Sequence, residues 1–443
     1  MRIASRLPYQ RASWNDIRQD SHAKDFMALI PTPMPLYSFL FGLAVAMAGT
    51  CSIAAPAAEA DAFYRPPSPL PPGQPGAVIR SRALTGSAAL PAAARNLLVL
   101  YHSRGLDGRD IAVSGTIAIP AGTPPAGGWP LTSWAHGTTG IGPACAPSRD
   151  TPAGPEHVFL GMKQKLMDDY VRRGYVVVAT DYEGLGGPGL HPFLQGVSAG
   201  RGVIDIMRAA RAIDPAIGAR YVVIGHSQGG HADLFAASLG PAYAPELKLL
   251  GNVAMAPASH IAATVQGMAA APKPSYALGY AMYVLQSFAS NHRGIDLKKI
   301  LSAQALAHLP QTRRDCITKT VSEGYWATSI PKDQFLARAD LAPVLDLAAA
   351  NEPNGLRISA PTLVVQGGAD DTVLPAWTDA VVRSLCGQGN SLHYTVYPAA
   401  THETIVTQAS EQVANFVADR FAGAAAPSSC GDLPTAAQAP RAD

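Results

Sequence analysis

Short apolar runs alternate with longer amphipathic stretches along most of the chain. The runs rich in Val, Ile and Leu predict strands at residues 111–119, 131–135, 175–179, 221–224, 249–255, 362–366 and 392–397. Stretches with helical spacing of apolar positions lie between them, at residues 158–173, 198–213, 229–239, 376–385 and 403–421. This alternation predicts an α/β fold, with a mostly parallel sheet and helices on both faces.

One interval interrupts the alternation. Residues 257–359 contain no convincing strand but many Ala, Leu and aromatic positions, which predicts an inserted helical cap. We expect the cap to lie over the carboxyl ends of the strands, where α/β sheets place their ligand sites. The predicted division is therefore an upstream polar segment and signal peptide (1–60), an extended amino-terminal arm (61–90), the α/β core (91–256 and 360–423), the cap (257–359) and an Ala/Pro-rich tail (424–443).

Composition and charge narrow the class of protein. Of 443 residues, 48% are hydrophobic and only 15% are charged, which is ample for a buried core and argues against disorder. The net charge is +2, and the Lys and Arg residues are scattered rather than gathered in a basic patch. Nucleic acid is therefore not an expected partner.

The amino-terminal segment has the features of an export signal. Residues 36–55 are almost uninterruptedly apolar, and Ala58-Glu59-Ala60 supplies the small-x-small pattern of a cleavage site. We expect a mature chain that begins near Asp61 and is secreted or periplasmic. A polar stretch precedes the apolar segment, so translation could start at Met1 or at Met27. An uncleaved membrane anchor is the less favoured alternative, because alanines crowd the carboxyl-terminal flank.

Export leaves four cysteines, Cys145, Cys316, Cys386 and Cys430, in an oxidising compartment. Two disulfides are expected, although four buried thiols are the alternative. Three pairings are possible. Cys386 and Cys430 bracket the last predicted strand and helix, which favours Cys386 with Cys430 and leaves Cys145 with Cys316.

The sequence Gly225-His226-Ser227-Gln228-Gly229 joins a predicted strand to a predicted helix. A serine at the apex of such a turn is exposed, and the residues two positions away on either side approach so closely that only glycine fits. The pentapeptide alone is common. Its position between strand and helix makes Ser227 the predicted nucleophile.

A serine hydroxyl needs a base to take its proton and an acid to orient that base, and in this fold they follow the serine in the order acid, histidine. The loop after residues 362–366 offers Asp370 and Asp371. We assign Asp371, three residues after Gly368; Asp370 is the alternative, and it could instead simply stabilise the turn. The predicted base is His402, which follows the strand at residues 392–397.

Two further histidines, His226 and His231, flank the nucleophile in sequence. A base on the turn itself cannot reach Ser227 in the required geometry, so we expect both to pack under the sheet.

The oxyanion that would form when the serine attacks a carbonyl needs two fixed donors. The backbone N–H of Gln228 is one; the loop after residues 131–135 supplies the other, assigned to Thr138 with Gly137 as the alternative.

Taken together, these motifs resemble the secretory lipase family of the lipase A type. The resemblance spans essentially Asp61 to Gly423, and the combination is more specific than any of its parts. It is carried by Phe63-Tyr64-x-Pro66-Pro67, Ile79-Arg80-Ser81, His136-Gly137-Thr138-Thr139-Gly140, Cys145-Ala146-Pro147-Ser148, Asp181-Tyr182-Glu183-Gly184-Leu185-Gly186, Gly225-His226-Ser227-Gln228-Gly229-Gly230, and Asp371 with His402.

The resemblance implies an α/β-hydrolase core with a late helical cap, two disulfides, no cofactor or metal, and a secreted triacylglycerol lipase or carboxylesterase. The expected partner is a small-molecule or lipid ester, with a lipid interface as a further possibility. An acyltransferase or peptidase could use the same residues. A non-catalytic binding module is the alternative from another class, and the complete set of predicted catalytic residues argues against it.

Overall fold

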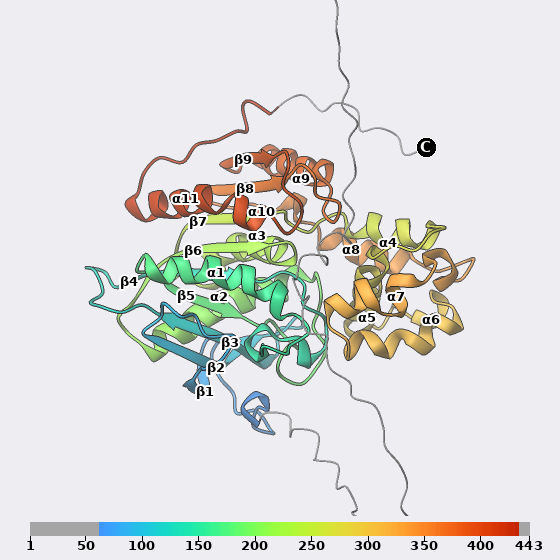
Figure 1. Cartoon of the computed structure of the whole chain (residues 1–443), viewed down its shortest axis with the longest axis horizontal. Coiled ribbons are helices and arrows are strands. Elements are labelled where there is room, and N and C mark those ends of the chain that lie inside the picture. Colours follow the sequence, from blue (N-terminus) through green and yellow to red (C-terminus); the bar gives the residue numbers. More distant parts are fainter. Residues whose placement is uncertain (1–61, 434–443) are drawn as a thin grey trace, which may run out of the picture. The chain divides into compact units, whose positions relative to one another are not determined.

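The computed structural model describes residues 62–433. This part of the chain forms a nine-stranded sheet (Figure 1). Strands β1 to β3 and β5 pair antiparallel in the order β1-β2-β3-β5, and the rest of the sheet, β5-β4-β6-β7-β8-β9, is parallel. The mostly parallel sheet predicted from the sequence is confirmed. The strands are β1 (Val78–Ala83), β2 (Arg95–Arg104), β3 (Asp110–Ile119), β4 (Trp129–Ala135), β5 (Val176–Thr180), β6 (Ile217–His226), β7 (Lys248–Met255), β8 (Thr362–Gly367) and β9 (Leu392–Tyr397).

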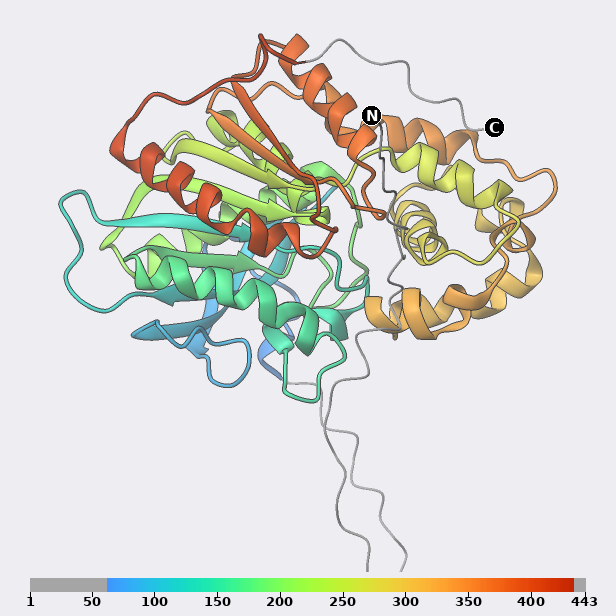
Figure 2. The ribbon, with the colours of Figure 1, turned by 45° about the horizontal axis from the view of Figure 1, so that its top comes forward.

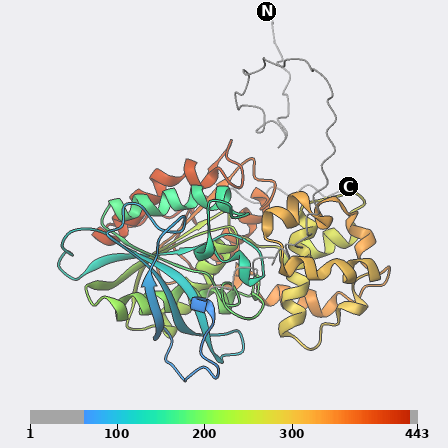
Figure 3. The same ribbon diagram turned by 60° about the horizontal axis from the view of Figure 1, so that its bottom comes forward.

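Helices cover both faces of the sheet, as Figure 3 shows. One face carries α2 (Gly196–Ile213), α3 (Gln228–Tyr243) and α9 (Pro375–Gly387); the other carries α1 (His157–Arg172), α10 (Ile405–Gln408) and α11 (Ser410–Ala422). Successive strand residues serve opposite faces: Val223 packs with the α2 side, whereas Val222 and Ile224 pack with the α1 side. Strands buried on both faces explain the continuous apolar runs in the sequence.

The sequence pattern did not predict β1 and β2. The apolar centre of β2, Leu98 to Tyr101, is fully buried, and a short continuous apolar run does not by itself distinguish a strand from a buried helix segment. Strand β1 lies at the edge of the sheet and carries arginines, which suit a solvent-facing edge but weaken the sequence signal. Both strands extend the sheet on its antiparallel side, away from the elements that carry the predicted site residues.

Between β7 and β8 the chain forms the helices α4 (Ile261–Ala270), α5 (Ala277–Asn291), α6 (Ala303–His308), α7 (Tyr325–Thr328) and α8 (Ala342–Ala350). We refer to this group of helices and their connections as the cap. They gather beside the sheet in Figure 2 and share an apolar cluster that includes Met282, Phe288 and Trp326. The cap therefore has its own buried core, as expected for an insertion that folds against an α/β sheet.

Two disulfides fasten the described part of the chain. Cys145 binds Cys316, which joins the core to the cap, and Cys386 binds Cys430. Both are the pairings that the sequence favoured. No helix among residues 62–433 combines the length and apolar character needed to span a bilayer. The predicted signal peptide, with its two candidate start residues, and the tail beyond residue 433 lie outside the described residues.

Candidate active site

Ser227 sits at a strained turn between β6 and α3. Its φ of 59° and ψ of −120° are rare for a residue with a side chain. A Cβ atom built on Gly225 would lie 2.1 Å from the carbonyl oxygen of Gly229, and one built on Gly229 would lie 1.9 Å from the carbonyl oxygen of Ala135. Both glycines are therefore steric requirements of the turn, as predicted.

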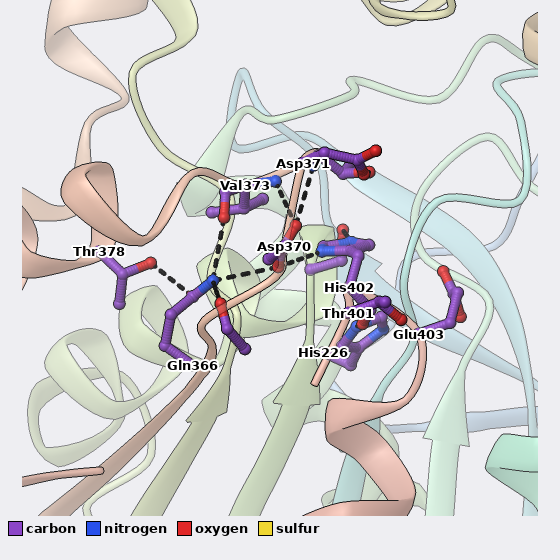
Figure 4. Close-up of polar contacts among 12 residues, drawn as sticks. His226, Gln366, Asp370, Asp371, Val373, Thr378, Thr401, His402 and Glu403 are labelled. Atoms are coloured by element: carbon purple, nitrogen blue, oxygen red, sulfur yellow. Dashed lines mark hydrogen bonds and ion pairs between the residues drawn. The ribbon is translucent and has the colours of Figure 1, made fainter. Parts of the chain in front are cut away.

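His402 lies between Ser227 and a carboxylate. Its Nε2 is 2.8 Å from Ser227 Oγ. Its Nδ1 is 2.8 Å from Asp370 Oδ2, as Figure 4 shows. A carboxylate only accepts hydrogen bonds, so Nδ1 carries the proton and Nε2 is free to accept the proton of the serine hydroxyl. The three side chains come from the ends of β6 and β8 and from the loop after β9, at the carboxyl edge of the parallel strands.

The prediction that Asp371 contacts the histidine is wrong, because Asp370 occupies that position. Asp371 is exposed, and its backbone carbonyl accepts a hydrogen bond from the Tyr276 phenol of the cap. Asp370 is buried and turned inward because its Oδ1 accepts the backbone N–H groups of Thr372 and Val373, at 2.9 and 2.8 Å. These bonds shape the turn so that Asp370, and not its neighbour, faces His402.

Further contacts hold the Asp370 carboxylate. Gln366 donates its amide to Asp370 Oδ2 at 3.1 Å, and the Gln366 carbonyl accepts the Thr378 hydroxyl at 2.7 Å (Figure 4). Burial alone would raise the pKa of Asp370, but the hydrogen bond and charge of His402 and the turn N–H groups lower it below 3.8. The carboxylate is therefore ionised where it faces the imidazole.

The loop predicted to hold the oxyanion packs against the serine turn. A Cβ atom built on Gly137 would lie 3.5 Å from Ser227 Cβ, and Thr138 beside it is buried. Gln228 is the first residue of α3, where backbone N–H groups have no acceptor within the helix. The structure thus places Gly137 and the first turn of α3 beside Ser227.

Three histidines have roles that the sequence did not reveal. His226 Nε2 is 2.8 Å from the backbone carbonyl oxygen of His402, and His231 Nε2 is 2.7 Å from that of Asn351. His191 Nδ1 donates to the carbonyl oxygen of Glu183, so its Nε2 accepts from the side-chain amide of Gln228 at 2.6 Å. No local motif signals the bonds to His402, Asn351 and Gln228, because each joins residues at least 37 positions apart.

No group of three or more His, Cys, Asp and Glu side chains among residues 62–433 is arranged to hold a metal ion. The arrangement of Ser227, His402 and Asp370 offers the chemistry of a serine nucleophile paired with an imidazole base.

Comparison with known proteins assigns the family. Residues 152–429 match the model of the secretory lipase family. A secreted triacylglycerol lipase of Malassezia globosa is 25% identical over 388 residues, which cover 82% of this chain and 79% of that protein. Lipase A of Moesziomyces aphidis is 24% identical over 369 residues, which cover 78% of this chain and 76% of that protein.

Solved structures agree on the fold. Candida antarctica lipase A has a TM-score of 0.74 at 21% identity, covering 85% of this chain and 89% of that one. The rice cell wall degrading esterase LipA of Xanthomonas oryzae has a TM-score of 0.62 at 19% identity. The match covers 79% of this chain and 98% of that one. The protein has the α/β-hydrolase fold, and it belongs to the secretory lipase family.

Proposed function

We propose that this protein is a secreted serine hydrolase of carboxylic esters, and that its main substrates are triacylglycerols. The observation that carries the proposal is the hydrogen-bonded series Ser227, His402, Asp370 at the carboxyl edge of the sheet. Family membership and the relatives described as secreted triacylglycerol lipases support the substrate class.

In the proposed mechanism, Ser227 Oγ attacks the ester carbonyl while His402 Nε2 takes the hydroxyl proton. Asp370 keeps His402 in the required tautomer and stabilises the imidazolium. The N–H groups of Gln228 and of Thr138 or Gly137 stabilise the oxyanion. His402 then protonates the departing alcohol, and a water molecule, deprotonated by His402, releases the acid and regenerates Ser227.

Secretion is part of the proposal. The sequence predicts an export signal that ends near Ala60, and two disulfides are typical of proteins that mature in an oxidising compartment.

A short-chain carboxylesterase is the second candidate, because one structural neighbour is described as an esterase. Initial rates on p-nitrophenyl esters from acetyl to palmitoyl, with emulsified triacylglycerol alongside, separate the two candidates. We expect long-chain and emulsion activity in the wild type and none in Ser227→Ala. Activity confined to short soluble esters would favour the esterase.

One relative supports a non-catalytic role. A probable inactive lipase of Mycobacterium tuberculosis is 28% identical over 213 residues, which cover 46% of this chain and 46% of that protein. A fluorophosphonate probe distinguishes this case. We expect it to label the wild type and not Ser227→Ala; a wild type that resists labelling, or a Ser227→Ala variant with wild-type turnover, would contradict the proposed mechanism.

A further inference from the structure

His226 precedes the nucleophile in sequence, but its side chain contacts the loop of the base. The residue ends β6 and is fully buried. Its Nε2 is 2.8 Å from the backbone carbonyl oxygen of His402, and the two rings lie 4.7 Å apart between centroids (Figure 4). The bond joins positions 176 residues apart.

The hydrogen bond defines the tautomer of His226. A carbonyl oxygen can only accept, so Nε2 of His226 carries the proton. Burial, followed by the charges of His402 and Lys163, lowers the pKa of His226 to about 3 against the opposing charge of Glu403, and the ring stays neutral at the pH of an assay. Because the ring is so weakly basic, it donates to His402 without competing with it for the proton of Ser227.

The same ring also faces the loop of the proposed oxyanion donors. A Cβ atom built on Gly137 would lie 3.3 Å from His226 Nδ1, so this loop approaches the ring at Nδ1, whereas Nε2 meets the carbonyl of His402. His226 therefore fills the space between Gly137 and the His402 backbone.

The segment that carries His402 is held from a second direction. Glu403, the next residue, forms an ion pair with Lys163 of α1, whose side chain is only 3% exposed. Burial alone would raise the pKa of Glu403, but Lys163 lowers it below 4.5. With the carbonyl of His402 bound by His226 and the side chain of Glu403 bound by Lys163, the backbone that supports the base is fixed on both sides.

We propose that His226 is a positioning residue for the hydrolysis: its Nε2–H holds the carbonyl of His402, and its ring keeps the base at its working distance from Ser227 and from the Gly137–Thr138 loop. This inference rests on the proposed function, in which His402 is the base. His226 itself does not contact the reacting atoms. Because reacting groups must be placed within a fraction of an ångström, loss of this support should reduce turnover more than substrate binding.

The test compares two substitutions at His226. His226→Gln keeps an N–H donor at a similar reach, and His226→Leu removes it. On a soluble p-nitrophenyl ester we expect His226→Leu to lower kcat about 10- to 100-fold, with little change in KM and a parallel fall in the rate of fluorophosphonate labelling. His226→Gln should recover most of that loss.

His231 supplies the matched control. It is also fully buried and also donates Nε2 to a carbonyl, but to Asn351 rather than to the base. His231→Leu should lower thermal stability to a similar degree and keep wild-type kcat. The inference is overturned if folded His226→Leu retains wild-type kcat, if His226→Gln is no better than His226→Leu, or if His231→Leu loses as much activity.

If His226→Leu does not fold, wild-type protein labelled with ¹⁵N-histidine gives an independent answer. The signals of His226 are identified by their loss in His226→Gln, and we expect a protonated Nε2 with slow proton exchange and an unprotonated Nδ1. The opposite tautomer would overturn the inference. Ser227→Ala separates the two proposals: if it is inactive while His226→Leu is fully active, only the role of His226 fails.

Discussion

Asp370 holds His402 with one carboxylate oxygen and its own turn with the other. Oδ2 accepts Nδ1–H of His402, and Oδ1 accepts the N–H groups of Thr372 and Val373. The sequence had presented turn stabilisation and contact with the base as alternatives for this residue. A carboxylate has enough acceptor positions for both. Because Oδ1 accepts the N–H groups of the turn, Oδ2 is the oxygen that His402 meets.

Asp370→Asn should therefore inactivate the protein without unfolding it. The turn N–H groups require an acceptor, so the amide oxygen takes the Oδ1 position and the NH₂ group faces His402. The imidazole must then accept at Nδ1 and carry its proton on Nε2, where it cannot accept from Ser227. We expect kcat on p-nitrophenyl butyrate to fall about 1,000- to 10,000-fold. Asp371→Asn is the control and should retain wild-type kcat; if it is the variant that fails, Asp371 is the acid after all.

Alanine at Gly229 should prevent the serine turn from forming, because its Cβ would meet backbone atoms that cannot move aside. We expect Gly229→Ala to destabilise the fold by about 3 kcal/mol or more. Gly161 in α1 is the contrasting position, since a Cβ there would meet nothing within 4 Å. Gly161→Ala should stabilise by about 0.5–1 kcal/mol. Urea unfolding measures both, and a Gly229→Ala protein of wild-type stability would contradict the geometry of the turn.

The disulfide between core and cap should contribute more to stability than the carboxyl-terminal one. It closes a sequence separation of 171 residues, against 44 for Cys386–Cys430. Replacing either pair by alanine should cost about 2–5 kcal/mol, and the loss for Cys145→Ala/Cys316→Ala should be the greater by about 1 kcal/mol. Urea unfolding of the two double variants under identical conditions provides the comparison. Equal losses would show that loop length does not govern the effect.

Asp233 should make the protein less stable as the pH rises. It is fully buried on α3, and burial raises its pKa well above 3.8 despite the nearby N–H groups of Leu234 and Gly225. Above pH 3.8 the unfolded chain loses this proton while the folded protein keeps it, so unfolding becomes more favourable until the pH reaches the folded pKa.

Asp233→Asn removes this titration. The stability of the variant relative to wild type should grow by about 1.4 kcal/mol per pH unit above pH 3.8, until the folded carboxyl itself ionises. Urea unfolding at a series of pH values measures the difference. Asp419→Asn, which removes an exposed carboxylate on α11, controls for the loss of one acid. A difference for Asp233→Asn that is constant with pH would mean that Asp233 is ionised in the folded protein.

Features that depend on local sterics or chain order were predictable from the sequence. The serine turn follows from Gly225 and Gly229, and His402 follows from its place after the last strand. The choice of Asp370 over Asp371 was not predictable, because it depends on which backbone N–H groups the turn directs at a carboxylate. The contact of His226 with His402 was not predictable either, since it appears only when β6 and the loop after β9 meet in space.

The position of Cys316 divides the cap into two parts, and cleavage by a protease in one part gives different products from cleavage in the other. A cut between residues 146 and 315 produces two fragments that the Cys145–Cys316 disulfide still joins. A cut between residues 317 and 385 leaves both of those cysteines on the amino-terminal fragment and the Cys386–Cys430 pair on the other, with no covalent link between them. Cleavage near α7 or α8 thus separates the fragment bearing Ser227 from the one bearing Asp370 and His402, whereas cleavage near α4 or α5 leaves nucleophile and base on one covalently connected molecule.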